Sequence, residues 1–176
     1  MKHLFTSFSL LLICSALFSQ IPSSNAASQS NAVKDGTTMA KLLLTKDYKG
    51  FTAFTYAPII KMAGGLDKMA SYMEQSFKGM KGEGFTIANV TVENCSKIIH
   101  TEKQLQCTLT EIIELKHTDG KLIQKSTLIG ISTDKGATWT FIDTHGETLK
   151  KLQETIKELS NELVILKQKQ PEIISN

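Results

Sequence analysis

Glu111 is the acidic side chain whose place in the sequence could support chemistry. It stands between Leu109 and Ile113 at alternate positions of an apolar run, so the spacing places it on the core face of a strand. Burial raises the pKa of a carboxyl group, and such a group can act as a general acid or base. A β-bulge near Thr110 would instead turn Glu111 toward solvent, and we expect this outward position because bulges are common in strands.

Two cysteines, Cys95 and Cys107, have a spacing that suits a disulfide bond. An exported chain favours such a bond, and closing this short loop would add about 3 kcal/mol of stability in the chain-entropy model. Cys107 shares its strand face with Leu105 and Leu109, whereas Cys95 is out of phase with the apolar positions before it. A bulge at Glu93–Ser96 would bring the two side chains to one side. Two free thiols are the alternative.

The histidines and methionines do not have the spacing of a metal site. His100, His117 and His145 fall at the ends of expected strands or helices, and none is spaced with a second ligand as zinc requires. The methionines of the helical region recur at helical spacing, which predicts flexible filler of a core rather than a copper(I) site. They are Met62, Met69, Met73 and Met80. The sequence also contains no phosphate-binding loop, metalloprotease motif or nucleophile elbow, so we expect no cofactor and no metal.

The stretch Ser132–Trp139 lies between two β-rich runs and has the residues of a tight turn. Asp134 can accept hydrogen bonds from turn amides, and Gly136 supplies a positive φ without steric cost. Ser132 can bond within the same loop, and Trp139 begins the returning strand. The stretch therefore predicts a β-hairpin whose turn has a structural role.

The spacing Ser132-x-Asp134-x-Gly136-x-x-Trp139 also resembles the Asp-box, a repeat of bacterial sialidases. In that family the repeat occurs several times, on propeller blades and away from the catalytic residues. Here it occurs once, and a mature chain of about 150 residues is too short for a propeller with blades of about 40–50 residues each. The resemblance therefore implies a hairpin and not a glycosidase.

Residues 1–26 have the features of a signal peptide. A short basic start precedes the apolar run Leu4–Phe18, which has the length of a signal-peptide centre and is too short to span a membrane. Small residues at Ser24 and Ala26 favour cleavage after Ala26, and an earlier cut before Gln20 is the alternative. We expect an exported protein, periplasmic or secreted, that has no transmembrane segment.

The rest of the chain fits one domain. Polarity predicts a flexible leader over residues 27–35, a domain over residues 36–168 and a frayed tail over residues 169–176. Without Lys2, 19 basic and 17 acidic residues remain of the 20 and 17 in the full chain, a net charge of +2. This balance gives no reason to expect nucleic acid, and the absence of arginine disfavours bidentate binding of phosphate. The expected partner is an unknown small ligand or a protein.

Apolar periodicity predicts helices first. One helix is expected from Thr37 or Thr38 to about Lys46, and a second is capped by Asp47. A break is expected at Tyr56–Pro58. The clearest helix has apolar residues at steps of three and four, and it contains Leu66, Met69, Ala70, Met73, Phe77 and Met80.

From Phe85 onward, apolar and polar residues alternate in place of the helical spacing. Strands are expected within Phe85–Ile99, Leu105–His117, Leu122–Ser132 and Trp139–Thr144, joined by short polar turns. A last helix capped by Asp143 or Thr144 follows, and the apolar stretch 163–166 would then add an edge strand or cover the core. The predicted fold class is α+β, with N-terminal helices packed on a curved four-stranded antiparallel meander and a C-terminal helix.

This order of elements resembles the cystatin-like superfamily and, within it, nuclear transport factor 2-like domains. The stretches Asp47–Phe51, Tyr56–Gly65 and Trp139–Asp143 carry the resemblance. Cystatin inhibitors have a Gln-x-Val-x-Gly loop, and no such segment occurs here. The resemblance implies a pocket between a concave sheet and the helices, for which the candidates are Tyr56, Glu111, Trp139 and Phe141.

Two functions are compatible with these observations. The first is a non-enzymatic exported domain whose sheet face binds a small apolar ligand or a protein, a second copy of the chain included. The second is a small pocket enzyme, a hydrolase or isomerase, in which Glu111 acts as acid or base with Tyr56 or Asp143 in support. Because no catalytic constellation is present in the sequence, we expect the binding domain.

Overall fold

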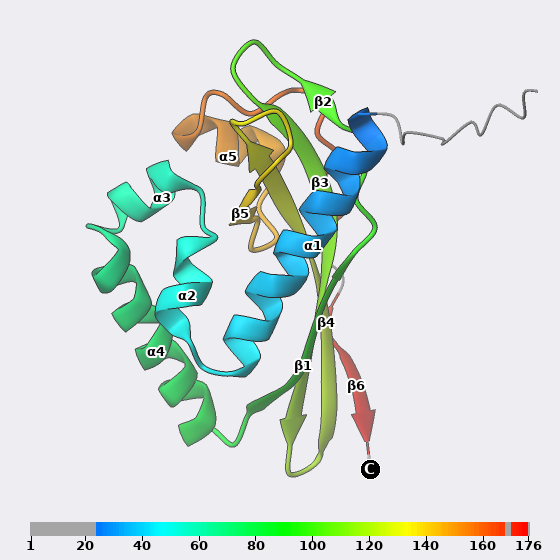
Figure 1. The fold of residues 1–176 in the computed structure, drawn as a ribbon. Helices are drawn as coiled ribbons and strands as arrows, with labels where there is room; N and C mark the ends of the chain where they lie inside the picture. Colours follow the sequence, from blue (N-terminus) through cyan, green and yellow to red (C-terminus); the bar gives the residue numbers. More distant parts are fainter. Residues whose placement is uncertain (1–23, 168–169, 176) are drawn as a thin grey trace, which may run out of the picture.

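Helices come first in the chain and an antiparallel sheet follows, which confirms the predicted α+β class (Figure 1). The computed structural model describes residues 24–167 and 170–175. The helices are α1 (Ser24–Leu44), α2 (Tyr48–Ala53), α3 (Ala57–Met62), α4 (Leu66–Gly82) and α5 (Leu149–Thr155). The strands are β1 (Thr86–Glu93), β2 (Ile99–His100), β3 (Leu105–His117), β4 (Gly120–Ser132), β5 (Thr140–Asp143) and β6 (Glu172–Ser175).

Helix α1 begins at Ser24, and the prediction of a flexible leader over residues 27–35 is wrong. The face that this part of the helix buries consists of Ser28, Ala32 and Gly36, so small residues replace the large apolar ones by which a sequence reveals a helix. A Cβ atom on Gly36 would lie 2.6 Å from Cγ1 of Val92. Helix α1 therefore approaches strand β1 more closely than a larger residue would permit.

The predicted start of this helix, at Thr37 or Thr38, lies in its middle. Both threonine hydroxyls donate to carbonyl oxygens one turn earlier, those of Val33 and Lys34 at 2.8 and 2.9 Å. A threonine in a helix interior commonly makes this bond, so a hydroxyl that suits a cap does not by itself mark one. Asp47, in contrast, does cap α2, because its carboxylate accepts a hydrogen bond from the Gly50 amide at 2.8 Å.

The main sheet has the order β1-β3-β4-β5, all antiparallel, and within the described residues it is open. This confirms the predicted four-stranded meander. Strands β3 and β4 pair without interruption from Leu105↔Ser132 to His117↔Gly120. The one shift of register in the β1–β3 pair lies between Ile87 and Asn89, so strand β3 has no bulge near Thr110.

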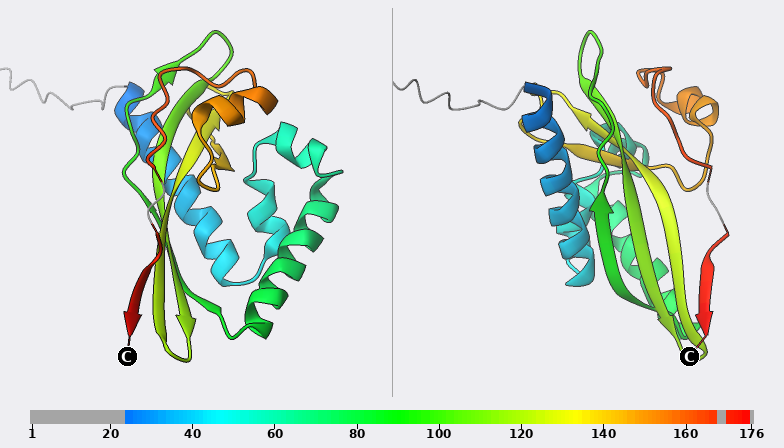
Figure 2. Two further views of the ribbon diagram at one scale, coloured as in Figure 1. Left: turned by 180° about the vertical axis from the view of Figure 1, so that it is seen from behind. Right: turned by 90° about the vertical axis from the view of Figure 1, so that its right-hand side faces the viewer.

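The two faces of the sheet support two separate cores. One lies under α1 and contains Val92, Cys107, Leu109, Leu128 and Phe141 among its buried residues. The other lies under α5 and is made mainly of isoleucine and leucine, with Ile129, Ile131, Ile142, Ile156 and Leu159 in it. Figure 2 shows α1 and α5 on opposite sides of the strands in its right-hand view. Alternation along β4 sends neighbouring side chains into different cores.

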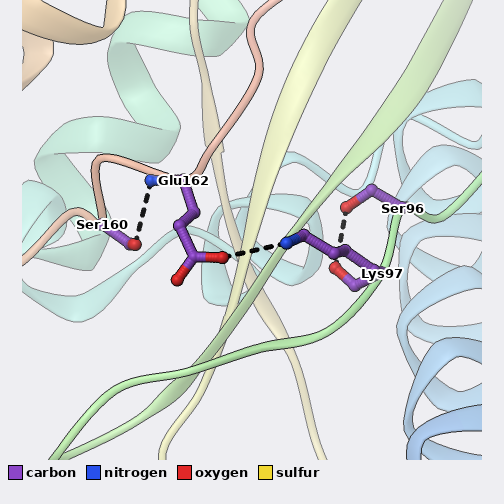
Figure 3. Close-up of polar contacts among 4 residues, drawn as sticks. All are labelled: Ser96, Lys97, Ser160 and Glu162. Carbon is purple, nitrogen blue, oxygen red and sulfur yellow. Dashed lines mark hydrogen bonds and ion pairs between the residues drawn. The ribbon is translucent and has the colours of Figure 1, made fainter.

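The segment after α5 covers the second core. Helix α5 is capped by Thr148, whose hydroxyl accepts from the Lys151 amide at 3.3 Å, so the predicted caps at Asp143 and Thr144 are wrong. Leu163 is buried in that core, so this stretch covers the core and does not form the edge strand that was the alternative. An ion pair of 2.9 Å joins Lys97 to Glu162 and ties the segment to the loop before β2 (Figure 3).

The frayed tail predicted over residues 169–176 is also wrong in its described part. Strand β6 pairs antiparallel with the first residues of β4, from Gly120↔Ser175 to Ile123↔Glu172. Figure 1 shows it at the edge of the long β3–β4 hairpin. Its four residues are a pattern too short to be read as a strand from the sequence alone.

Candidate functional site

A largely apolar cavity of about 570 Å³ lies between the helical layer and the sheet. We call it the Glu111 cavity, since Glu111 belongs to its lining together with residues of α1, α2, α4, β3, β4, β5 and α5. Its volume is in the range of small-molecule binding sites in proteins. Its apolar lining includes Leu43, Phe51, Met69, Met73, Phe77 and Phe141.

The cavity exists because α4 does not pack directly on the sheet. No residue of α4 is fully buried, although Met69, Met73 and Phe77 form an apolar stripe along it. The helix instead packs on α2, where the rings of Tyr48 and Phe77 stack with their centroids 5.6 Å apart. The apolar stripe therefore faces the space over the sheet and remains half-buried, because no protein side chain fills that space.

Glu111 is buried in this cavity, with an exposed fraction of 4%, so the expected outward position is wrong. Its strand has no bulge, and the register pairs Glu111 with Ser126 of β4. The Ser126 hydroxyl donates a hydrogen bond to Oε2 of Glu111 at 3.2 Å. Loss of solvation and, to a smaller extent, the nearby carboxylate of Asp143 raise the pKa of Glu111, while the Ser126 bond lowers it, and together they bring this pKa to about 7.

Four more titratable side chains belong to the lining of the cavity, and one of them, Asp143, lies near enough to Glu111 to raise its pKa. Asp143, His145, Glu147 and Lys151 belong to its lining, and they come from the end of β5, the loop after it and α5. Nδ1 of His145 lies 3.2 Å from Oδ2 of Asp143. The lining from α1, α2 and α4 has no charged side chain. The cavity is therefore polar at one end and apolar along the helices.

Two of the predicted pocket residues do not line this cavity. Tyr56 packs against the second core, and its hydroxyl lies 3.4 Å from Oε1 of Gln104. Burial raises the pKa of Tyr56, and the charge of Glu158 raises it further. Trp139 has an exposed fraction of 1% and belongs to the core under α1. Of the four candidates, the structure brings only Glu111 and Phe141 together in the lining.

The turn between β4 and β5 is built by the side chains that the sequence singled out. Asp134 accepts hydrogen bonds from Ser132 at 2.8 Å and from the Thr138 hydroxyl at 2.6 Å, and these bonds hold its pKa at about 2. Gly136 has a φ of +87° and its amide donates to the Ser132 hydroxyl at 2.8 Å. Nε1 of Trp139 donates to the carbonyl of Gly136 at 3.3 Å. These bonds stay within the hairpin, which gives the turn a structural role.

The same turn anchors α1. The Trp139 amide donates to Oδ2 of Asp35 at 2.9 Å, and the side-chain amide of Asn31 donates to the Gly136 carbonyl at 2.9 Å. Both partners lie in residues that the sequence placed in a leader. Helix α1 and the hairpin turn therefore position each other, and α1 supplies Met39 and Leu43 to the cavity.

Cys95 and Cys107 are free thiols in this structure, although they contact each other. A hydrogen bond between them lowers the pKa of Cys95 and, together with burial, raises that of Cys107 far above its ordinary value. Asn94 has a φ of +56°, and this local irregularity after β1 turns Cys95 toward Cys107. The bulge predicted at Glu93–Ser96 is wrong, because β1 ends at Glu93 and the register shift of the β1–β3 pair lies between Ile87 and Asn89. The disulfide itself stays a prediction.

Within the described parts of the chain, no group of three or more His, Cys, Asp and Glu residues could hold a metal ion. In the same parts of the chain, no helix is both long enough and apolar enough to cross a bilayer. Comparison of the chain with protein-family models, with curated proteins and with solved structures finds no match. The case for a function therefore depends on the geometry of the Glu111 cavity.

Proposed function

We propose that this protein is an exported domain that binds a small, mainly apolar ligand in the Glu111 cavity, without catalysing a reaction. The observation that supports it is an apolar cavity of about 570 Å³ with a buried carboxylate in its lining. Ligand sites in proteins commonly combine an apolar lining with a few polar groups that orient the ligand.

The methionines of α4 favour binding of an apolar ligand. Met69, Met73 and Met80 are partly exposed to the cavity, where their contact with water is unfavourable. Methionine side chains are flexible and adapt to ligands of different shape. An apolar ligand would remove this surface from water, and each Å² of apolar area so buried contributes about 25 cal/mol. The helical layer thus gains stability when the cavity is filled.

A protein partner or a second copy on the same face is less well supported. The helices α1, α2 and α4 lie over the face of the sheet that carries Leu109 and Leu128. A homodimer formed through that face would have to displace them. A small ligand needs only the space that is already there.

Titration with N-phenyl-1-naphthylamine, whose fluorescence rises in apolar surroundings, tests the proposal. We expect saturable binding by the wild-type protein and strong loss of binding in Met73→Lys, which places a charged side chain in the cavity. The matched control is Met62→Lys, because Met62 lies outside the lining and has an exposed fraction of 62%. Equal binding by both variants, or no binding by the wild-type protein, would contradict the proposal.

A proton-transfer enzyme is the second candidate, and one observation favours it. The pKa of Glu111 is raised to about 7, and a general acid or base is most effective when its pKa lies near the working pH. Asp143 lies close enough to raise this pKa, so it could support Glu111, whereas Tyr56 lies outside the cavity. An isomerase or hydrolase would then use Glu111 to move a proton.

A screen of carbonyl compounds, esters and epoxides separates this candidate from simple binding. Turnover that is lost in Glu111→Gln, while binding of N-phenyl-1-naphthylamine is kept, would establish the enzyme. Binding without turnover of any compound would support the binding domain.

Export is part of the proposal. Residues 1–23 lie outside the described part of the chain, and the expected cleavage after Ala26 would remove the first residues of α1. The packed residues Ser28 and Ala32 would remain in the mature protein. N-terminal sequencing of the protein recovered from an expressing bacterium tests both the export and the position of the cut.

A further inference from the structure

We propose that the ligand of the Glu111 cavity carries one ammonium group, and that this group binds to the carboxylate of Glu111 while an alkyl or aryl part occupies the methionine-lined region. The inference deepens the proposed function and rests on it, since it assigns the chemical class of the ligand that the cavity takes. An apolar amine fits the distribution of charge in the cavity, and an alcohol or a fatty acid fits it less well.

The first reason is that Glu111 lacks a cationic partner. Among the described residues, its carboxylate receives one hydrogen bond, from the neutral hydroxyl of Ser126 at 3.2 Å, and it takes part in no ion pair. With an exposed fraction of 4%, it is also shielded from water. Buried carboxylates in proteins are normally paired with a cation, because an unpaired buried charge costs several kcal/mol.

The second reason is that the basic side chains of the lining have other partners. Nζ of Lys151 lies 2.8 Å from Oε2 of Glu154, and His145 lies 3.2 Å from Asp143. Besides Glu111, the lining holds two more acidic residues, Asp143 and Glu147, and no charged residue from α1, α2 or α4. The charges that face the cavity therefore favour a cation and oppose an anion at this end.

The third reason is the shape of the charge distribution. Polar groups occupy one end of the cavity, and the rest is lined by methionine, leucine and phenylalanine side chains such as Met69, Met73 and Phe77. A molecule with one charged end and an apolar remainder can satisfy both regions at once. A polyamine would place a second charge against the apolar wall, where desolvation of that charge is unfavourable.

The protonation state of Glu111 makes the binding depend on pH. Its pKa of about 7 means that the carboxyl group is largely neutral at pH 5.5 and largely ionised at pH 8. An alkyl ammonium ion stays charged over this range, because an aliphatic amine has a pKa near that of lysine, about 10.4. Because the amine binds the ionised carboxylate, its affinity should therefore fall by about thirtyfold from pH 8 to pH 5.5.

Calorimetric titration with decylamine, decanol and decanoate tests the inference, because the three compounds share an alkyl chain and differ in charge. At pH 8 we expect decylamine to bind the wild-type protein about tenfold more tightly than decanol, and decanoate to bind most weakly. Glu111→Gln should remove the preference for the amine, so that decylamine and decanol bind this variant with similar affinity. Glu114→Gln is the matched control, since Glu114 lies on the same strand outside the cavity and should keep the preference.

The outcomes separate the inference from the proposed function. Three results would overturn the assignment of an amine and leave the binding cavity intact. The first is binding of decanol without a preference for decylamine, and the second is a preference that survives in Glu111→Gln. The third is tighter binding of decanoate. Absence of binding by all three compounds would overturn the proposed function itself. Should Glu111→Gln fold poorly, the fall in decylamine affinity between pH 8 and pH 5.5, with constant decanol affinity, tests the same claim in the wild-type protein.

Discussion

Replacement of Glu111 by glutamine should stabilise the folded protein at high pH and have little effect in acid. The folded-state pKa is about 7 and the ordinary value is 4.5. Below pH 4.5 the carboxyl is neutral in both the folded and the unfolded state, and it causes no loss of stability. Between the two values the folded state retains a proton that the unfolded chain has lost, so the free energy of unfolding falls by about 1.4 kcal/mol per pH unit.

Above pH 7 the carboxylate is ionised in both the folded and the unfolded state, and the free energy of unfolding falls no further. The difference of about 2.5 between the two pKa values corresponds to a loss of about 3 kcal/mol. Glutamine has the same shape, and its carbonyl oxygen can still accept the hydrogen bond from Ser126. The variant should therefore be more stable than the wild-type protein by about 3 kcal/mol at pH 9, and the difference should approach zero at pH 4.

Urea denaturation of both proteins at pH 4, 6 and 9 measures this difference. Glu114→Gln, on the same strand but outside the cavity, controls for the change in net charge. A variant that is less stable than the wild-type protein at pH 9, or a difference that does not change with pH, would refute the argument that Glu111 is buried as an unpaired acid.

Three further predictions concern the fold and its processing. Gly136→Val should lower the free energy of unfolding by about 2 kcal/mol or more in a melting experiment, because φ is +87° and a Cβ atom would clash with α1. The control Gly79→Ala lies on the open face of α4 and should be neutral or stabilising. Cys95 and Cys107 should be bonded in the exported protein; intact mass after alkylation without reduction should show no labelled thiol, and reduction should lower stability by about 3 kcal/mol. N-terminal sequencing of the exported protein should give a chain that starts after Ala26, and a retained residue 1 would contradict the predicted signal peptide.

The sheet could be predicted because each of its signals is local. The long alternation in Leu105–His117 and the Asp-Gly pair at Asp119 determine the central hairpin, and the residues Ser132–Trp139 determine the next turn. Helix α4 follows from its regular apolar stripe. These elements have the structure that their own residues favour, so no knowledge of distant contacts is needed.

Helix α1 and strand β6 could not be predicted, because contacts with residues far away in the sequence stabilise them. Residues 27–35 are polar and small, and they are helical because Ser28, Ala32 and Gly36 fit closely on β1 and on the hairpin turn. Strand β6 exists because an edge of β4 is available to it. Polarity alone favoured disorder in both places.

Only part of the candidate site could be predicted, because it also depends on contacts between distant residues. The alternation that contains Glu111 indicates the inner face, but we expected a bulge to turn the side chain outward, and the structure has no such bulge. Asp143 could be named as a neighbour, but its approach depends on how β5 pairs with β4. Tyr56 and Trp139 are aromatic residues that the resemblance suggested for a pocket, and the structure assigns them to solid cores instead.

The most direct test of the central claim, that the Glu111 cavity binds an apolar ligand, uses the methyl groups of methionine. Among the described residues, four methionines line the cavity, and they are Met39, Met69, Met73 and Met80, whereas Met62 lies outside it. In protein labelled with ¹³C at the methionine methyls, titration with decylamine or decanol should shift the four cavity signals together and leave that of Met62 in place. Unchanged cavity signals at saturating ligand, or equal shifts at Met62, would contradict the claim.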